Sequence, residues 1–143
     1  MKPVLFLRTA AVLTLIHAVL HTIGGVFSTP EPGPQLTAVT AMKTNQFLLM
    51  GHVRSYWDFY MGMGLCATLF MTVEAVAFWQ LASLAKTESM RLRPVYATFC
   101  VGFVVMAGMS YRYFFLGPVI VEILIAICLG LAFFASKAVP VRV

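Results

Sequence analysis

Long apolar runs alternate with short polar breaks along this chain of 143 residues. Four runs, at residues 4–27, 55–84, 92–115 and 118–135, are long enough to cross a bilayer as helices, because about 20 mostly apolar residues span its hydrocarbon core. Prolines explain the first and third breaks: three lie within residues 28–34, and Gly117-Pro118 separates the last two runs. The pattern predicts an all-α fold, an integral membrane four-helix bundle forming a single domain over residues 1–143.

The longest polar connection, residues 28–54, joins the first two predicted helices. Between residues 35 and 51 the apolar side chains of Leu36, Val39, Phe47 and Met50 lie among polar residues. A short amphipathic helix on the membrane surface would place such side chains among the lipid headgroups. We therefore predict a surface helix in this connection.

The overall composition supports a membrane location. Hydrophobic residues make up 61% of the chain and charged residues 10%, and the mean hydropathy is +0.91. Soluble domains are about one quarter charged. The net charge of +5 comes from short loops and tails, where membrane orientation explains basic residues. We expect the lipid bilayer as the main partner, and no nucleic acid.

The distribution of basic residues predicts which ends face the cytoplasm. Short cytoplasmic loops are enriched in Lys and Arg. One set of loops and tails carries seven basic residues: Lys2, Arg8, Lys86, Arg91, Arg93, Lys137 and Arg142. The opposite set carries three, Lys43, Arg54 and Arg112. This difference predicts that both termini lie in the cytoplasm.

A few polar residues inside or beside the apolar runs are the candidate functional groups. Ionisable residues in a membrane span are costly and usually face a protein interior or a cavity. The ligand-binding candidates are His17, His21, Arg54, Asp58, Arg112 and Glu122. Every predicted helix brings at least one of them to its outer half, so we expect an outer polar cluster in which Arg112 pairs with Asp58 or Glu122.

The last predicted helix also carries a stripe of small residues. Glu122, Ala126 and Gly130 follow one another at intervals of four residues, and small residues at this spacing allow close helix packing. Because Glu122 cannot face lipid cheaply, this stripe is expected to face the bundle.

His17 and His21 lie four residues apart, on one face of the first predicted helix. This spacing can hold a metal ion, but the general base found between the histidines of zinc protease motifs is missing here. Histidines in membrane helices commonly hydrogen-bond to a neighbouring helix. The pattern favours a structural or ligand-contacting pair and no metal site. A haem or chlorophyll-type pigment with one axial ligand, through His17 or His21, is the alternative.

Two segments carry a resemblance to known proteins. The run RSYWDFYMGMG at residues 54–64, together with His17-x-x-x-His21-x-x-Gly24-Gly25, resembles a family of small bacterial four-helix proteins of the inner membrane. The resemblance covers the first two helices and the overall plan, and it implies a location without an assigned reaction. In plan the chain is also distantly similar to the DoxX-like and emopamil-binding-like proteins.

Two functions remain open from the sequence. The outer polar cluster can form the floor of a cavity for an apolar ligand with a polar head, such as a quinone or an isoprenoid. Alternatively, the chain is an accessory subunit of a larger energy-transducing membrane complex and contacts other membrane subunits, pigment or haem. The sequence contains no nucleophile elbow and no glycine-rich phosphate loop, so no reaction is predicted.

Overall fold

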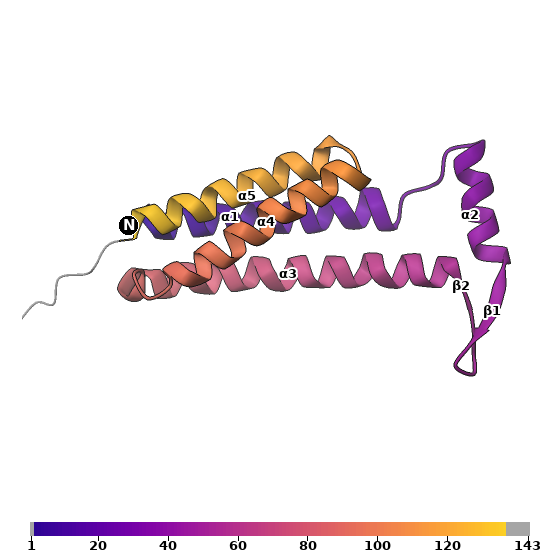
Figure 1. Ribbon diagram of the computed structural model, residues 1–143, viewed down its shortest axis with the longest axis horizontal. Coiled ribbons are helices and arrows are strands. Elements are labelled where there is room, and N and C mark those ends of the chain that lie inside the picture. Colours follow the sequence, from indigo (N-terminus) through magenta and orange to yellow (C-terminus); the bar gives the residue numbers. More distant parts are fainter. Residues whose placement is uncertain (1, 137–143) are drawn as a thin grey trace, which may run out of the picture. The chain divides into compact units, whose positions relative to one another are not determined.

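Helices dominate the computed structural model, which describes residues 2–136. Lys137 and Arg142, which contribute to the predicted orientation, lie outside the described residues. The elements in chain order are α1 (Lys2–His21), the π-helix η1 (Thr22–Val26), α2 (Pro34–Thr44), β1 (Gln46–Leu49), β2 (His52–Ser55), α3 (Tyr56–Glu88), α4 (Arg93–Tyr113) and α5 (Leu116–Ala135) (Figure 1). The predicted all-α class is confirmed, with one small β-hairpin added.

Four of these helical segments are long and apolar enough to cross a membrane. They cover Pro3–Val26, Tyr56–Glu88, Arg93–Tyr113 and Leu116–Ala135. The first of them continues from α1 into η1. These bounds follow the four predicted runs closely, and the main difference is that α3 continues to Glu88 instead of ending at residue 84.

The connection before α3 differs from the prediction. A helix does form in this connection, α2, and it includes Leu36 and Val39, but it ends at Thr44. The chain then forms an antiparallel hairpin, so Phe47 lies on β1 and Met50 lies in the turn. Met50 and Gly51 have φ angles of 50° and 83°, and two positive φ angles are typical of a tight two-residue hairpin turn. The prediction that Phe47 and Met50 share a surface helix with Leu36 and Val39 was therefore wrong.

The sequence predicts one domain, and contacts within the structure group the chain into two compact units. The first unit comprises Met1–His17 and Met71–Val143, and the second comprises Ala18–Phe70. Helices α1 and α3 contribute residues to both units.

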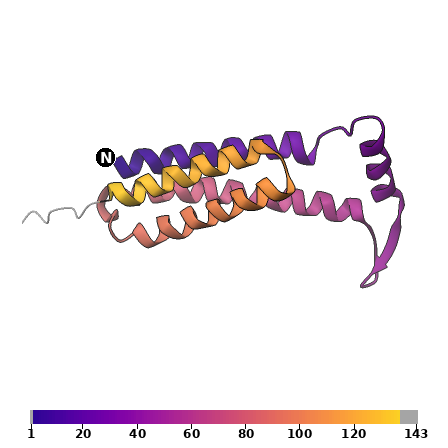
Figure 2. The ribbon, with the colours of Figure 1, turned by 45° about the horizontal axis from the view of Figure 1, so that its top comes forward.

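The core of the first unit is built from alanines and a few large side chains. Its buried members are Leu7, Ala10, Ala11, Phe78, Ala82, Ala85, Tyr96, Phe103, Ile125, Ala126, Leu129 and Ala132. Helices α4 and α5 form an antiparallel hairpin, and α5 lies beside the first turns of α1 (Figures 1 and 2). Small side chains at these contacts let the helix backbones approach closely.

The predicted stripe on α5 faces this core. Glu122 and Ala126 are buried, and a Cβ placed on Gly130 would lie 3.8 Å from the sulfur of Cys100 on α4. The Cys100 thiol also donates to the carbonyl of Ala126 at 3.3 Å. The prediction that this face packs inward is confirmed.

Candidate functional site

In the second unit, His21 at the end of α1 bonds to the backbone of α3. Its Nε2 lies 3.1 Å from the carbonyl oxygen of Gly64, and because a carbonyl can only accept, Nε2 carries the proton. Gly64 permits the close approach, since a Cβ at this position would lie only 2.8 Å from Cγ2 of Val26. His21 is therefore an interhelical donor.

Two further hydrogen bonds connect η1, which continues α1, to the same helix α3. The hydroxyls of Thr22 and Thr68 lie 2.9 Å apart, and the Tyr60 hydroxyl donates to the carbonyl of Gly25 at 3.0 Å. A π-helix alters the usual backbone pairing of a helix, and Tyr60 provides a donor to one carbonyl of η1. On α3, Tyr60, Gly64 and Thr68 recur every four residues and so share one face. We refer to these three bonds together as the polar seam.

Asp58 belongs to the cap of α3. Its Oδ2 accepts hydrogen bonds from the backbone N–H of Ser55 at 2.7 Å and from the Ser55 hydroxyl at 3.0 Å. The backbone N–H of Asp58 donates in return to the Ser55 hydroxyl at 3.3 Å. This reciprocal arrangement is a capping box, which satisfies backbone donors at a helix start. The carboxylate also lies favourably at the positive end of the helix dipole.

A small hollow lies where the hairpin meets the start of α3. It encloses about 260 Å³ and is lined by Leu49, Met50, His52, Arg54, Asp58 and Phe59. The Arg54 guanidinium donates to the adjacent carbonyl of Val53 at 2.8 Å, and its other donors have no partner among the described residues. Since Oδ2 of Asp58 serves the cap, Oδ1 remains available as an acceptor. We call this space the hairpin hollow.

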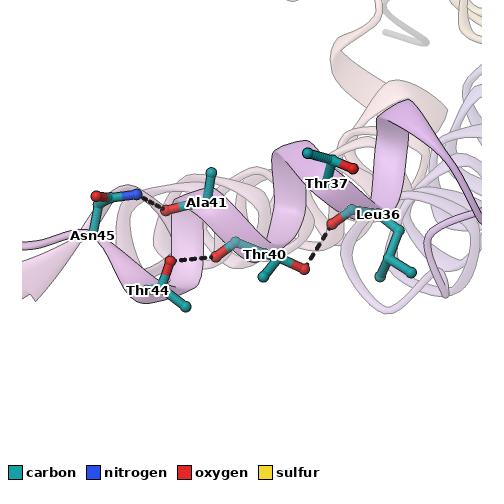
Figure 3. A pocket seen from close by; sticks show the side chains of 6 residues that line it. All are labelled: Leu36, Thr37, Thr40, Ala41, Thr44 and Asn45. Atoms are coloured by element: carbon teal, nitrogen blue, oxygen red, sulfur yellow. Dashed lines mark hydrogen bonds between the residues drawn. The ribbon is translucent and has the colours of Figure 1, made fainter.

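A larger and more open hollow follows α2. It encloses about 510 Å³ and is lined by Leu36, Thr37, Thr40, Ala41, Thr44 and Asn45. Figure 3 shows that the hydroxyls of Thr40 and Thr44 and the amide of Asn45 donate to carbonyls of the same helix. Because these donors are already used, this surface offers little for recognising a polar ligand.

In the first unit, Glu122 is buried against α4. The residue is 2% exposed, and its Oε1 accepts a hydrogen bond of 2.9 Å from the Ser110 hydroxyl. Its Oε2 has no partner among the described residues. A buried carboxyl oxygen without a partner carries a desolvation cost, so the Ser110–Glu122 bond matters for the stability of the α4–α5 hairpin.

The expected ion pair between Arg112 and Glu122 does not form within residues 2–136. Arg112 is exposed, and its guanidinium lies 5.3 Å from the ring centre of Tyr113. The reason is helix phase: Arg112 follows Ser110 by two residues, or about 200° around α4. When Ser110 faces Glu122, Arg112 points away.

The six predicted site residues are distributed over both units. His17, Arg112 and Glu122 belong to the first unit, and His17 is buried there. His21, Arg54 and Asp58 belong to the second. Arg54 and Asp58 line the hairpin hollow together, while His21 contributes to the polar seam. The common outer cluster of His21, Asp58, Arg112 and Glu122 stays a prediction.

Several important residues were missed by the sequence reading. Ser55 had a recognisable signal, because Ser-x-x-Asp before an apolar run is a capping-box pattern. His52 also lines the hollow, although its place just outside an apolar run gave no hint of this. Ser110 had no distinctive signal in the sequence.

The lining of the hairpin hollow combines a guanidinium donor, a carboxylate acceptor and an imidazole with an apolar wall. Within residues 2–136, His, Cys, Asp and Glu side chains form no group of three or more that could hold a metal ion. No family model matches the chain, and neither a curated protein nor a solved structure matches it.

Proposed function

We propose that this chain is a multi-pass protein of a bacterial inner membrane with both termini in the cytoplasm. Four long apolar helices support the membrane location. Large apolar side chains such as Leu5, Leu69 and Phe134 are exposed along them, as expected for faces in contact with lipid. The Lys and Arg distribution supports the orientation, and the sequence resemblance supports the bacterial inner membrane.

The orientation can be tested with single cysteines in a background where Cys66, Cys100 and Cys128 are replaced. A membrane-impermeant thiol reagent added to intact cells should label Thr37→Cys in the first connection. It should not label a cysteine appended after Val143 until the membrane is opened. Labelling of the appended cysteine but not of Thr37→Cys would contradict the orientation.

The function that we propose is the binding of a membrane amphiphile, which is an apolar molecule with a polar head such as a quinone or an isoprenoid. The observation that carries it is the hairpin hollow, whose lining combines Leu49 and Phe59 with Arg54. Small-molecule sites are typically concave and apolar with a few convergent polar groups. Arg54 supplies unused donors for the head, and the aromatic and aliphatic wall contacts the adjoining apolar part.

The charges of the lining also limit which polar head group the hollow can bind. Arg54 and Asp58 carry opposite charges, so the lining has no formal net charge when His52 is neutral. A head that both accepts and donates hydrogen bonds fits this lining, because it can engage Arg54 and Oδ1 of Asp58 together. The other candidates act elsewhere, with His21 in the polar seam and Glu122 in its bond to Ser110.

Fluorescence titration tests this function with a defined probe. In a Trp79→Phe background, Trp57 is the single tryptophan and immediately precedes Asp58. Decylubiquinone added to the detergent-purified protein should quench it saturably. Arg54→Gln should raise the apparent Kd about tenfold or more, since a hydrogen bond to a charged group contributes about 1.5–3 kcal/mol and each 1.4 kcal/mol is a factor of ten.

The matched control for this titration is Arg91→Gln. Arg91 is exposed and forms an ion pair with Glu88 at 3.3 Å in the first unit, so its loss should leave quenching unchanged. Farnesol serves as a second probe that competes for the hollow through an isoprenoid tail. Identical titrations of the parent protein and Arg54→Gln would contradict the proposed site.

A further inference from the structure

The two faces of the β-hairpin are chemically different. Strand pairing sets Phe47 opposite Arg54 and Leu49 opposite His52, and successive side chains of a strand alternate between faces. The Phe47 ring lies 5.1 Å from that of Tyr56 and 6.1 Å from that of Phe59. This face therefore packs on the first turn of α3 and borders the hairpin hollow.

The opposite face and the turn present apolar side chains without cover. Leu48 pairs with Val53 on that face, and these residues are 73% and 58% exposed. Met50 at the tip is 93% exposed and adopts a positive φ, which is uncommon for a residue with a side chain. Contiguous exposed apolar groups usually mark an interaction surface, and a lone two-stranded hairpin is only marginally stable in water.

The position of the hairpin limits what can cover this face. Strand β2 ends at Ser55 and α3 begins at Tyr56, so the hairpin is joined directly to a candidate membrane span. Leu49 and Met50 near the tip share the hollow with Phe59 from the first turn of that span. The hairpin is thus held at the level where α3 begins, rather than extended away from it.

The orientation of α2 and the hairpin agrees with a position at the start of α3. Helix α2 and the hairpin run across the direction of α3 in both views (Figures 1 and 2). A four-residue strand extends only about 13 Å, and the headgroup region on each side of a bilayer is about 5–8 Å thick. If α3 crosses the membrane, the hairpin lies along the membrane surface and cannot leave its neighbourhood.

The charge of the segment matches a lipid surface. Residues 34–55 contain Lys43, His52 and Arg54 and no acidic residue. Lys43 lies with its ammonium 4.4 Å from the ring centre of Trp57, and tryptophan is enriched at the membrane–water interface. Lys43 can therefore complement anionic phosphates above acyl chains, whereas His52 and Arg54 lie on the face that borders the hollow.

We infer that the β1–β2 hairpin inserts into the interface of the membrane that the chain spans. Leu48, Met50 and Val53 contact the upper acyl chains, while Lys43 remains among the headgroup phosphates. This inference rests on the membrane location given under the proposed function. It deepens that function, because Met50 lines the hollow and also belongs to the inserted surface, so an amphiphile in the interface can reach the hollow at the tip of the hairpin.

A fluorescent label on the hairpin tests the insertion. The full chain carrying Met50→Cys, with its native cysteines replaced, is labelled with the dye NBD and reconstituted into vesicles of phosphatidylcholine and phosphatidylglycerol. The emission should be blue-shifted, weakly quenched by aqueous iodide and strongly quenched by nitroxide-labelled lipid. Gln35→Cys at the exposed start of α2 is the control, and its label should show the opposite preference.

A second label at Val53 keeps the test independent of the strained turn. It should behave like the label at residue 50, because both positions belong to the uncovered apolar surface. Iodide quenching at residues 50 and 53 as strong as at residue 35 would overturn the inference. Protection that disappears when the protein is diluted with excess lipid would also overturn it, since a second copy would then be the cover.

The two proposals can fail separately. Lipid-protected labels together with no decylubiquinone binding would remove the amphiphile function and keep the inserted hairpin. Saturable binding with iodide-accessible labels would keep the binding function and remove the insertion.

Discussion

Replacing Gly64 with alanine should lower stability, whereas the same change at Gly62 should preserve or raise it. A Cβ at Gly64 would lie 2.8 Å from Cγ2 of Val26, but a Cβ at Gly62 would meet nothing within 4 Å. Val26 is buried, and its branched side chain cannot rotate freely away. Overpacking of this kind costs about 1–3 kcal/mol, and the shift would also strain the hydrogen bond from His21 to Gly64.

Both variants gain the same helix propensity, about 1 kcal/mol for Gly to Ala, so their difference isolates the contact with Val26. Thermal unfolding in one detergent, followed by circular dichroism, gives that difference directly. We expect Gly64→Ala to unfold at a clearly lower temperature than Gly62→Ala. Equal unfolding temperatures would show that the close approach at Gly64 is not part of the fold in solution.

Removing the hydroxyl that bonds Glu122 should have the second large effect. In Ser110→Ala, the carboxyl of Glu122 loses the hydroxyl that donates to it while remaining buried. Leaving a buried polar group unsatisfied costs about 1–3 kcal/mol. Replacing both partners with apolar residues is often nearly neutral, so the double variant Ser110→Ala/Glu122→Met should recover most of the lost stability.

Ser83→Ala is the control for this comparison. Ser83 is exposed on α3, and its hydroxyl makes a long bond of 3.4 Å to the carbonyl of Trp79 in its own helix, so its loss should change the unfolding temperature little. The account of Glu122 is contradicted if Ser110→Ala and Ser83→Ala unfold alike. It is also contradicted if the double variant is less stable than Ser110→Ala alone.

The sequence was sufficient for the large features of the fold because they depend on length and composition. An apolar run of the right length has few alternatives to a helix, and Pro and charged residues set the breaks. The stripe from Glu122 to Gly130 was also predictable, since helical spacing alone places its members on one face. The β-hairpin was not predicted, because Met50-Gly51 lacks the Asn-Gly or Asp-Gly pair that usually marks such a turn.

The candidate site was harder to predict because its polar groups hydrogen-bond to nearby side chains or to the backbone rather than to one another. Asp58 bonds to Ser55 three residues earlier rather than to a distant cation. His21 bonds to a backbone carbonyl. Every residue has such a carbonyl, so the pattern of side chains cannot show which one is the partner. Arg112 and Ser110 lie two residues apart, on opposite sides of α4. Both have a similar depth along the helix, so depth alone could not show which of them faces Glu122.

Identifying the molecules that copurify with the protein from its own membrane is the most direct test of the proposed function. The parent chain and Arg54→Gln are purified in parallel, and organic extracts of each are compared by mass spectrometry and visible absorption. The account predicts one amphiphile with a polar head that is stoichiometric in the parent and depleted in Arg54→Gln, with both proteins equally folded. Equal amounts in both proteins, or a haem or pigment in place of an amphiphile, would contradict it.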